Sequence, residues 1–258
     1  MIKEADKFID SNIFEGILSI RSIISANNCG ANKDGTNDRK IHKVLFDKAK
    51  VEKKSRELRY LETNGCTIEF ADSEVLDKMT IGNTHGGIVA VCGERTFPSL
   101  STDNIKPNGF YVMLEGVEDP YNFGYSLRTM YAAGVDGIVL TPRNWMGAAG
   151  VVCRASAGAS ELFPMSIAES DAADVFKSAG YNIVCADIKN AVSIYETELR
   201  YPIFLIIGGE KRGISRTLLD KADKVIKLDY GRDFKGALST ASAASVITYE
   251  IYRQNLHN

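Results

Sequence analysis

The chain has 258 residues, of which 45% are hydrophobic and 25% are charged, and its formal net charge is −2. This length allows one large domain or two modest ones, each with its own core. So small a net charge excludes a uniformly basic nucleic-acid binder, and any nucleic-acid site must therefore be a local patch.

Cysteine usage and the chain start bear on the compartment. The five cysteines are scattered without a Cys-x-x-Cys pair, and only three histidines accompany them. A zinc site is therefore not expected. The cysteines are expected to be isolated buried thiols in a reducing cytoplasm. The amino terminus MIKEADKFID is acidic and polar, unlike a signal peptide. No apolar run approaches the roughly 20 residues of a membrane span. The sequence thus predicts a cytoplasmic protein without a metal or a membrane segment.

Residues 1–97 are expected to form a small αβα unit. Helices and strands alternate along this part, which is typical of a layered α/β domain. Thr84–Gly87 contains His85, Gly86 and Gly87, and we interpret it as a tight turn. A polar loop is expected at Asn27–Asp38. The expected helices are Asn12–Ala26, Lys53–Thr63 and Ser73–Met79, the last capped by Ser73, and the expected strands are Ile41–Phe46, Cys66–Phe70 and Gly87–Cys92.

A basic run lies within this unit. Between Arg39 and Arg59, nine basic side chains stand against three acidic ones, a local excess of six. Such a run is usually a solvated face. On a domain that reads RNA it would instead contact phosphates and make binding sensitive to salt. The basic residues are Arg39, Lys40, Lys43, Lys48, Lys50, Lys53, Lys54, Arg56 and Arg59.

Residues 98–108 are predicted to form a linker, because they contain two prolines and few apolar side chains. Residues 109–258 are then a second domain. Repeated βα units in it predict a mostly parallel sheet. The expected strands are Phe110–Leu114, Gly137–Leu140, Tyr181–Ala186, Ile203–Ile207 and Val225–Leu228, and the helices are one capped by Asn122, Gly147–Ser160, Asp171–Ala179, Ser215–Ala222 and Ala237–Gln254.

The stretch Glu115–Leu140 concentrates the chemistry. A loop with three acids, a Gly and a Pro follows a buried strand, and a helix then begins near Asn122. Arg128 lies about one and a half turns into that helix. The ordinary interpretation is a βαβ crossover whose arginine is solvated. The composition of the loop favours a functional site instead.

Two motifs resemble a known family. Asp119–Gly124, which reads DPYNFG and is followed by Arg128, resembles the first motif of the SpoU (TrmH-type) RNA ribose methyltransferases of the SPOUT superfamily. Gly208–Ser215, which reads GGEKRGIS, resembles their second motif. The resemblance covers the second domain well and the first loosely. It implies a small substrate-binding domain followed by an α/β domain tied as a trefoil knot.

The resemblance also implies an activity and partners. The activity is methyl transfer from S-adenosylmethionine to a ribose 2′-hydroxyl of ribosomal or transfer RNA, without a metal. The second domain would form a homodimer, with Arg128 supplied by the partner. The implied catalytic residues are Arg128, Asn122 and Glu210, and the implied cofactor-binding residues are Gly208, Gly209, Leu228, Leu238 and Ser239.

The roles of these residues leave alternatives open. The family assigns activation of the hydroxyl to Arg128, yet a guanidinium with a pKa above about 12 is a poor base. Arg128 would then stabilise the developing alkoxide electrostatically. Glu210 is either a surface acid after a strand or a group that orients a basic partner. Leu228 and Leu238 could serve core packing as well as cofactor contact.

The third motif departs from the family pattern. Family members usually read Ser-Leu-Asn-Val-Ser there, whereas this chain reads Ala237-Leu238-Ser239-Thr240-Ala241. The loop 229–236 is also one residue longer than usual. An alternative function is therefore a catalytically impaired RNA-binding protein of the same fold. A generic nucleotide-binding enzyme is disfavoured, because neither GxxxxGK[ST] nor GxGxxG is present around Gly208.

Overall fold

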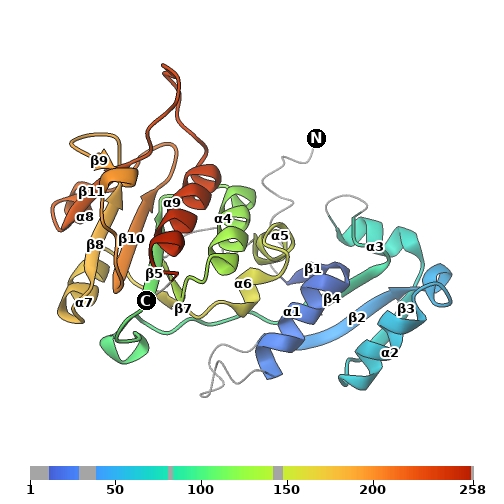
Figure 1. The fold of residues 1–258 in the computed structure, drawn as a ribbon. Helices are drawn as coiled ribbons and strands as arrows, with labels where there is room; N and C mark the ends of the chain where they lie inside the picture. The colour runs from blue at the N-terminus through green and yellow to red at the C-terminus, as the bar shows by residue number, and fades with distance from the viewer. Residues whose placement is uncertain (1–11, 29–38, 81–83, 142–147, 257–258) are drawn as a thin grey trace. The chain divides into compact units, whose positions relative to one another are not determined.

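The computed structural model describes residues 12–28, 39–80, 84–141 and 148–256. It divides into two compact units (Figure 1). Unit 1 comprises Met1–Thr96 with Asn144–Leu162, and unit 2 comprises Phe97–Arg143 with Phe163–Asn258. Most of the expected loop Asn27–Asp38 lies outside the described residues.

Unit 1 is built on a four-stranded sheet with the order β1-β4-β2-β3. Strands β2 and β3 are parallel, and the other pairs are antiparallel. The strands are β1 (Ile13–Glu15), β2 (Ile41–Asp47), β3 (Ile68–Ala71) and β4 (Ile88–Cys92), and the helices are α1 (Gly16–Asn28), α2 (Ser55–Thr63), α3 (Ser73–Met79), α5 (Ala149–Ala155) and α6 (Ala159–Leu162).

Alternating residues of β2 face two separate cores. Val44 and Phe46 pack in one cluster with Leu61 of α2. Leu45, which points to the opposite face, packs with Leu76 of α3. Both faces of the sheet are thus covered by helices, and the predicted αβα arrangement is confirmed.

The start of the first predicted helix is wrong. Ile13–Glu15 forms strand β1, and the helix begins only at Gly16, whose φ is 78°. Phe14 is fully buried, and β1 pairs with β4. Sheet pairing and burial therefore override the helical spacing of the apolar residues.

The predicted cap of α3 is also wrong. Asp72 is the N-cap, and its side chain makes no capping hydrogen bond. Ser73 Oγ donates instead to buried Asp47 Oδ2 over 2.6 Å, and this bond lowers the pKa of Asp47. The serine hydroxyl satisfies a buried carboxylate rather than a helix end.

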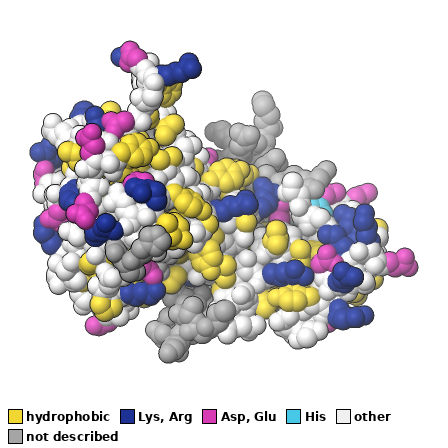
Figure 2. Space-filling model, in the orientation of Figure 1, with side chains coloured by type: hydrophobic (Ala, Val, Ile, Leu, Met, Phe, Trp, Pro, Cys, Tyr) yellow, Lys and Arg dark blue, Asp and Glu magenta, His cyan; other side chains and the backbone are white. Residues whose placement is uncertain are grey.

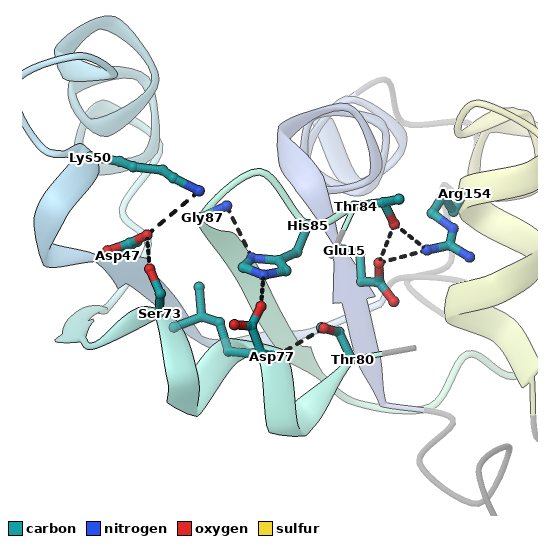
Figure 3. A network of polar contacts seen from close by, with 11 residues as sticks. Glu15, Asp47, Lys50, Ser73, Asp77, Thr80, Thr84, His85, Gly87 and Arg154 are labelled. Atoms are coloured by element: carbon teal, nitrogen blue, oxygen red, sulfur yellow. Dashed lines mark hydrogen bonds and ion pairs between the residues drawn. The ribbon is translucent and has the colours of Figure 1, made fainter. Parts of the chain in front are cut away.

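The turn before β4 is held by a buried histidine (Figure 3). Gly86 and Gly87 have φ of 61° and 87°, a conformation that glycine adopts without strain. Gly87 N donates to His85 Nδ1 over 3.0 Å, and His85 Nε2 lies 2.8 Å from Asp77 Oδ1. Because Nδ1 accepts, Nε2 carries the proton and donates to the carboxylate. The interpretation of Thr84–Gly87 as a tight turn is confirmed.

The small-residue helix expected at Gly147–Ser160 is instead two short helices, α5 and α6. The chain breaks between them at Ala157 and Gly158, whose φ values are 53° and 90°. A Cβ on Gly150 would lie 1.9 Å from Ile13 O, so the glycine lets α5 approach β1 closely. The pair Arg39 Nε–Glu161 Oε2 at 2.8 Å ties α6 to the same unit. The compact units therefore differ from a simple division at the linker 98–108.

Unit 2 contains a seven-stranded sheet in which every pairing is parallel, as predicted. Its order is β7-β6-β5-β10-β8-β11-β9. The strands are β5 (Phe110–Glu115), β6 (Gly137–Leu140), β7 (Met165–Ile167), β8 (Asn182–Ala186), β9 (Val192–Ser193), β10 (Ile203–Gly208) and β11 (Lys224–Lys227), and the helices are α4 (Pro120–Ala132), α7 (Ala172–Ser178), α8 (Arg216–Leu219) and α9 (Thr240–Gln254).

Helices cover the sheet of unit 2 on both faces. Phe176 of α7 stacks on Phe204 of β10, with ring centroids 4.0 Å apart, within a large buried cluster. Helices α4 and α9 pack against each other (Figure 1). Of the helices in the described ranges, none is long and apolar enough to cross a membrane.

The sheet order places three loops together. Chain order reverses beside β10, which lies between β5 and β8. Because all pairs are parallel, the loops after β5, β10 and β11 leave the same edge of the sheet. Such an edge is where open α/β sheets bind ligands.

Candidate functional site

Helix α4 is started by Asp119, not by Asn122 as predicted. The Asp119 side chain accepts a hydrogen bond from Asn122 N over 2.7 Å, and Pro120 occupies the first helical turn. Proline suits that position because its missing N–H would be unpaired there anyway. Because Asn122 does not cap the helix, its side chain can contact another residue.

Glu210 links the three loops that leave one edge of the sheet of unit 2, those after β5, β10 and β11. Its Oε1 accepts from Asn122 Nδ2 over 3.0 Å and from Thr240 N, at the start of α9, over 3.3 Å. A carboxylate is favoured there, since the helix N-terminus carries partial positive charge. The partners are an amide and a backbone N–H, whereas the sequence leaves open a surface acid or a group that orients a basic partner. The sequence analysis did not name Thr240 as a site residue. Its place in the third motif, which departs from the family pattern, could have pointed to it.

Gly208 lets its own loop fold back closely, and Gly209 lets that loop pack on the backbone of the loop after β5. A Cβ on Gly208 would lie 2.4 Å from Gly213 C, and one on Gly209 would lie 2.2 Å from Gly116 O. Gly209 N also donates to Glu115 O over 2.6 Å. The packing of the chain on itself therefore requires glycine at both positions, independently of any ligand.

A hollow of about 490 Å³, a volume typical of small-molecule sites, is lined mainly by residues 228–238 of the segment that leads from β11 to α9. Leu228 and Leu238 both line it, together with Val246 of α9. Ser239 caps α9 by accepting from Ser242 N over 3.2 Å. The remaining lining residues are Tyr195, Asp229, Tyr230, Gly231, Arg232 and Phe234.

Arg128 lies on an exposed face of α4. It forms no hydrogen bond or ion pair with another residue in the described part of the chain. Its neighbours on this helix include Tyr125 and Tyr131, which are 50% and 45% exposed. On α9, Tyr249 and Tyr252 are exposed as well. The structure therefore places Arg128 on an aromatic surface and not among the residues that line the hollow.

Three buried cysteines are not candidates for nucleophilic chemistry. Cys92, Cys153 and Cys185 are buried. Burial raises the pKa of Cys185 to about 12 and that of Cys92 to about 12. Such thiols stay protonated and unreactive at neutral pH. Within the described ranges no group of His, Cys, Asp and Glu side chains could hold a metal ion.

Replacing Gly209 tests the packing of the two loops. We expect Gly209→Ala to lower the free energy of unfolding by about 1–3 kcal/mol, because its Cβ would overlap the Gly116 backbone. Gly231→Ala is the matched control, since its Cβ would meet open space. It should change stability by less than about 0.5 kcal/mol. Urea denaturation of both variants measures this, and equal midpoints would contradict the packing argument.

Comparison with known proteins gives two family matches, which lie in different parts of the chain. A sequence model of the SpoU rRNA Methylase family matches residues 109–249. A second, described as RNA 2′-O ribose methyltransferase substrate binding, matches residues 35–98.

Individual relatives agree with these matches. YacO of Bacillus subtilis (strain 168), named as a TrmH-family tRNA/rRNA methyltransferase, is 29% identical over 84% of this chain and 90% of its own length. A protein of the same family name from Staphylococcus haemolyticus is 35% identical over 55% of this chain and 58% of its own length. The SpoU methyltransferase AviRb from Streptomyces viridochromogenes, solved with AdoMet, has a TM-score of 0.77 at 18% identity, covering 95% of this chain and 91% of that one. This structural likeness shows a shared fold.

Proposed function

Because this chain belongs to the SpoU rRNA methylase family, we propose that it transfers a methyl group from S-adenosylmethionine to a ribose 2′-hydroxyl of ribosomal or transfer RNA in the cytoplasm. The observation that carries the proposal is the Glu210 junction. It joins Asn122 of the first motif to Thr240 of the third, and Leu238 of the third motif lines the hollow. The motifs of the sequence thus meet in space where the sheet order favours a ligand.

The hollow fits the proposed cofactor. Its aliphatic side chains, Leu228, Leu238 and Val246, suit an adenine and a thioether-like chain. Among the described residues, the backbone N–H groups of 229–237 make one hydrogen bond to another backbone group, from Phe234 to Arg232. The other amides are available to a bound ligand. When bound, the cofactor supplies an electrophilic methyl group on a sulfonium ion.

Arg128 is the residue that we propose acts on the RNA. A 2′-hydroxyl is a weak nucleophile until its proton is drawn off. A guanidinium is a planar cationic donor, so it can stabilise the developing alkoxide and a neighbouring phosphate. One preorganised donor of this kind contributes about 10²–10³-fold in rate.

We also propose that two copies of unit 2 associate through α4 and α9. Both helices expose aromatic side chains, and Arg128 lies on that surface rather than in the hollow of its own chain. A second copy would cover the aromatic rings and would receive Arg128 at its own site. The proposed dimer therefore explains the position of the arginine and the exposed rings together.

The oligomeric state tests this arrangement. We expect the parent protein to sediment as a dimer at micromolar concentration, and Tyr249→Glu to shift it toward the 28.3 kDa monomer, because a buried unpaired carboxylate is costly. The matched control is Val75→Glu, an exposed position of unit 1, which should leave the dimer intact. A parent that sediments only as a monomer would contradict the proposal.

Residues 1–97 are proposed to bind the RNA, with 98–108 as linker and 109–258 as the methyltransferase domain. The basic run needs one correction, since Arg39 is 5% exposed and paired with Glu161. Figure 2 shows the basic side chains that gather over β2, β3 and α2 of unit 1. Within the described part of the chain, those without an ion-pair partner include Lys53, Lys54, Arg56 and Arg59. These four are the proposed phosphate contacts.

Neutralising these four side chains should weaken RNA binding. We expect the Lys53→Gln, Lys54→Gln, Arg56→Gln, Arg59→Gln variant to show lower affinity and a salt dependence shallower by about 0.7–0.9 per lost contact. Fluorescence anisotropy across a salt series measures both. The matched control removes four exposed charges of unit 2, at Lys177, Lys189, Arg216 and Arg253. If both variants bind equally well, the basic run is only a solvated face.

The second candidate is RNA binding without methyl transfer, favoured by Ala237 and Ser239. Labelled S-adenosylmethionine incubated with total RNA from a strain that lacks the gene distinguishes the two. We expect label in RNA from the parent protein and none from Arg128→Lys at matched time. Tight RNA binding with no transferred label would favour the second candidate.

A further inference from the structure

The loop between β11 and α9 exposes two aromatic rings that the core does not use. Tyr230 and Phe234 are 40% and 56% exposed, and their ring centroids lie 5.8 Å apart at an interplanar angle of 58°. This loop projects from unit 2 (Figure 1). Two exposed rings on one short loop leave much apolar surface in water, which favours a ligand that covers them.

The rings are held in place by the loop. Tyr230 Oη accepts a hydrogen bond from Leu238 N over 3.3 Å, and Phe234 N donates to Arg232 O over 2.8 Å. A Cβ on Gly236 would lie 2.4 Å from Cζ of Phe234, so the glycine leaves room for the ring. Phe234 is therefore positioned before any ligand arrives.

One cationic side chain of this loop, that of Arg232, is not engaged in an ion pair with any residue that the structure describes. Lys235 Nζ lies 2.7 Å from Asp233 Oδ1, so these two largely cancel. Arg232 has no ion-pair partner among the described residues, and it lines the hollow together with Phe234. An aromatic face beside an unpaired guanidinium matches a nucleotide, which has a flat base and an anionic phosphate.

We propose that Phe234 stacks on a base of the substrate RNA next to the methylated ribose, while Arg232 contacts a phosphate of the same segment. This assignment rests on the proposed function and names the RNA-contacting groups of its site. Aliphatic side chains form the part of the hollow suited to the cofactor, whereas the Phe234 ring faces solvent, from which RNA arrives. Single-stranded RNA is commonly recognised by stacking of its unpaired bases on aromatic side chains.

The test compares RNA with and without bases. A fluorescein-labelled, mixed-sequence single-stranded RNA and an abasic oligomer of equal length are titrated with the full chain in the presence of S-adenosylhomocysteine. We expect Phe234→Leu to lower affinity for the base-bearing RNA about tenfold, within the range that aromatic stacking contributes. Affinity for the abasic oligomer should stay within about twofold. Phe234→Tyr keeps the ring and should bind both like the parent.

Further measurements separate the possible roles of this loop. Arg232→Gln should lower the affinity for both oligomers and reduce the slope of log affinity against log salt concentration by about 0.7. Calorimetry should give the same S-adenosylmethionine affinity for Phe234→Leu and the parent. A loss of cofactor affinity with unchanged RNA affinity would overturn the proposal and assign the ring to the cofactor, and unchanged affinity for every probe would overturn it too. Because these readouts are equilibrium binding, they hold even if the protein transfers no methyl group.

Discussion

Arg128→Lys should lower kcat for methyl transfer by about 100-fold or more and leave the affinity for S-adenosylmethionine nearly unchanged. Lysine keeps the charge but loses the planar fork that can hold a phosphate and the 2′-oxygen together. An interaction made mainly in the transition state has this kinetic signature. Arg128 is exposed and has no described side-chain partner, so the substitution should not disturb the fold.

The control for this variant is Arg216→Lys. Arg216 is exposed on α8 and pairs with Asp220 over 2.8 Å, so the change should alter neither kcat nor stability measurably. Single-turnover kinetics with saturating cofactor report the chemical step. A parent enzyme with robust turnover that is indifferent to Arg128→Lys would show that another group activates the hydroxyl.

Glu161→Ala should lower the free energy of unfolding by about 3–5 kcal/mol, because it leaves the charge of Arg39 buried and unpaired. The two side chains are 4% and 6% exposed. Arg39 also donates to Gly93 O and lies over the Phe14 ring, with its Cζ 4.6 Å from the ring centroid. The guanidinium is thus fixed from several sides and cannot turn to solvent cheaply.

A double variant separates the charge effect from packing. Arg39→Met with Glu161→Leu should recover most of the loss, since a buried ion pair is replaceable by apolar side chains of similar size. Asp220→Ala removes an exposed pair and should cost less than about 1 kcal/mol. Urea denaturation of the three proteins measures the differences. If Glu161→Ala is as stable as Asp220→Ala, α6 is not an integral part of unit 1.

Five of the seven strands of unit 2 were predicted because their physical signal is local, whereas the short strands β7 and β9 were missed. Phe110–Leu114 is a continuous apolar run, and it is found as β5 with one more residue. Ile203–Ile207 is found as β10 in the same way. Strands buried on both faces need no partner information to be recognised. The threaded knot that the resemblance implies stays a prediction.

The errors concern features that depend on distant residues. Phe14 forms part of a strand because β4 offers a pairing edge, which local helical spacing does not show. Arg39 belongs to a basic run in sequence, yet Glu161 draws it into the interior. The break between α5 and α6 likewise reflects their packing on α1 and β1.

The candidate site was predictable in its residues but not in its geometry. The motifs located Asn122, Glu210 and Leu238, while the structure shows that Glu210 binds a helix N-terminus. The hollow could not be foreseen, because Tyr195 and Val246, which are distant in the chain, complete the lining formed by residues 228–238. Phe234 was missed as well, although an aromatic side chain in a charged, glycine-containing loop is a signal that the sequence does carry.

The most direct test of the proposed activity is nucleoside mass spectrometry of RNA from cells with and without the gene. Ribosomal and transfer RNA are digested separately, and each 2′-O-methylnucleoside is quantified. We predict that one such nucleoside is lost without the gene, returns with the parent gene, and does not return with Arg128→Lys. Unchanged 2′-O-methylation in both RNA classes, or the loss of a base-methylated nucleoside instead, would contradict it.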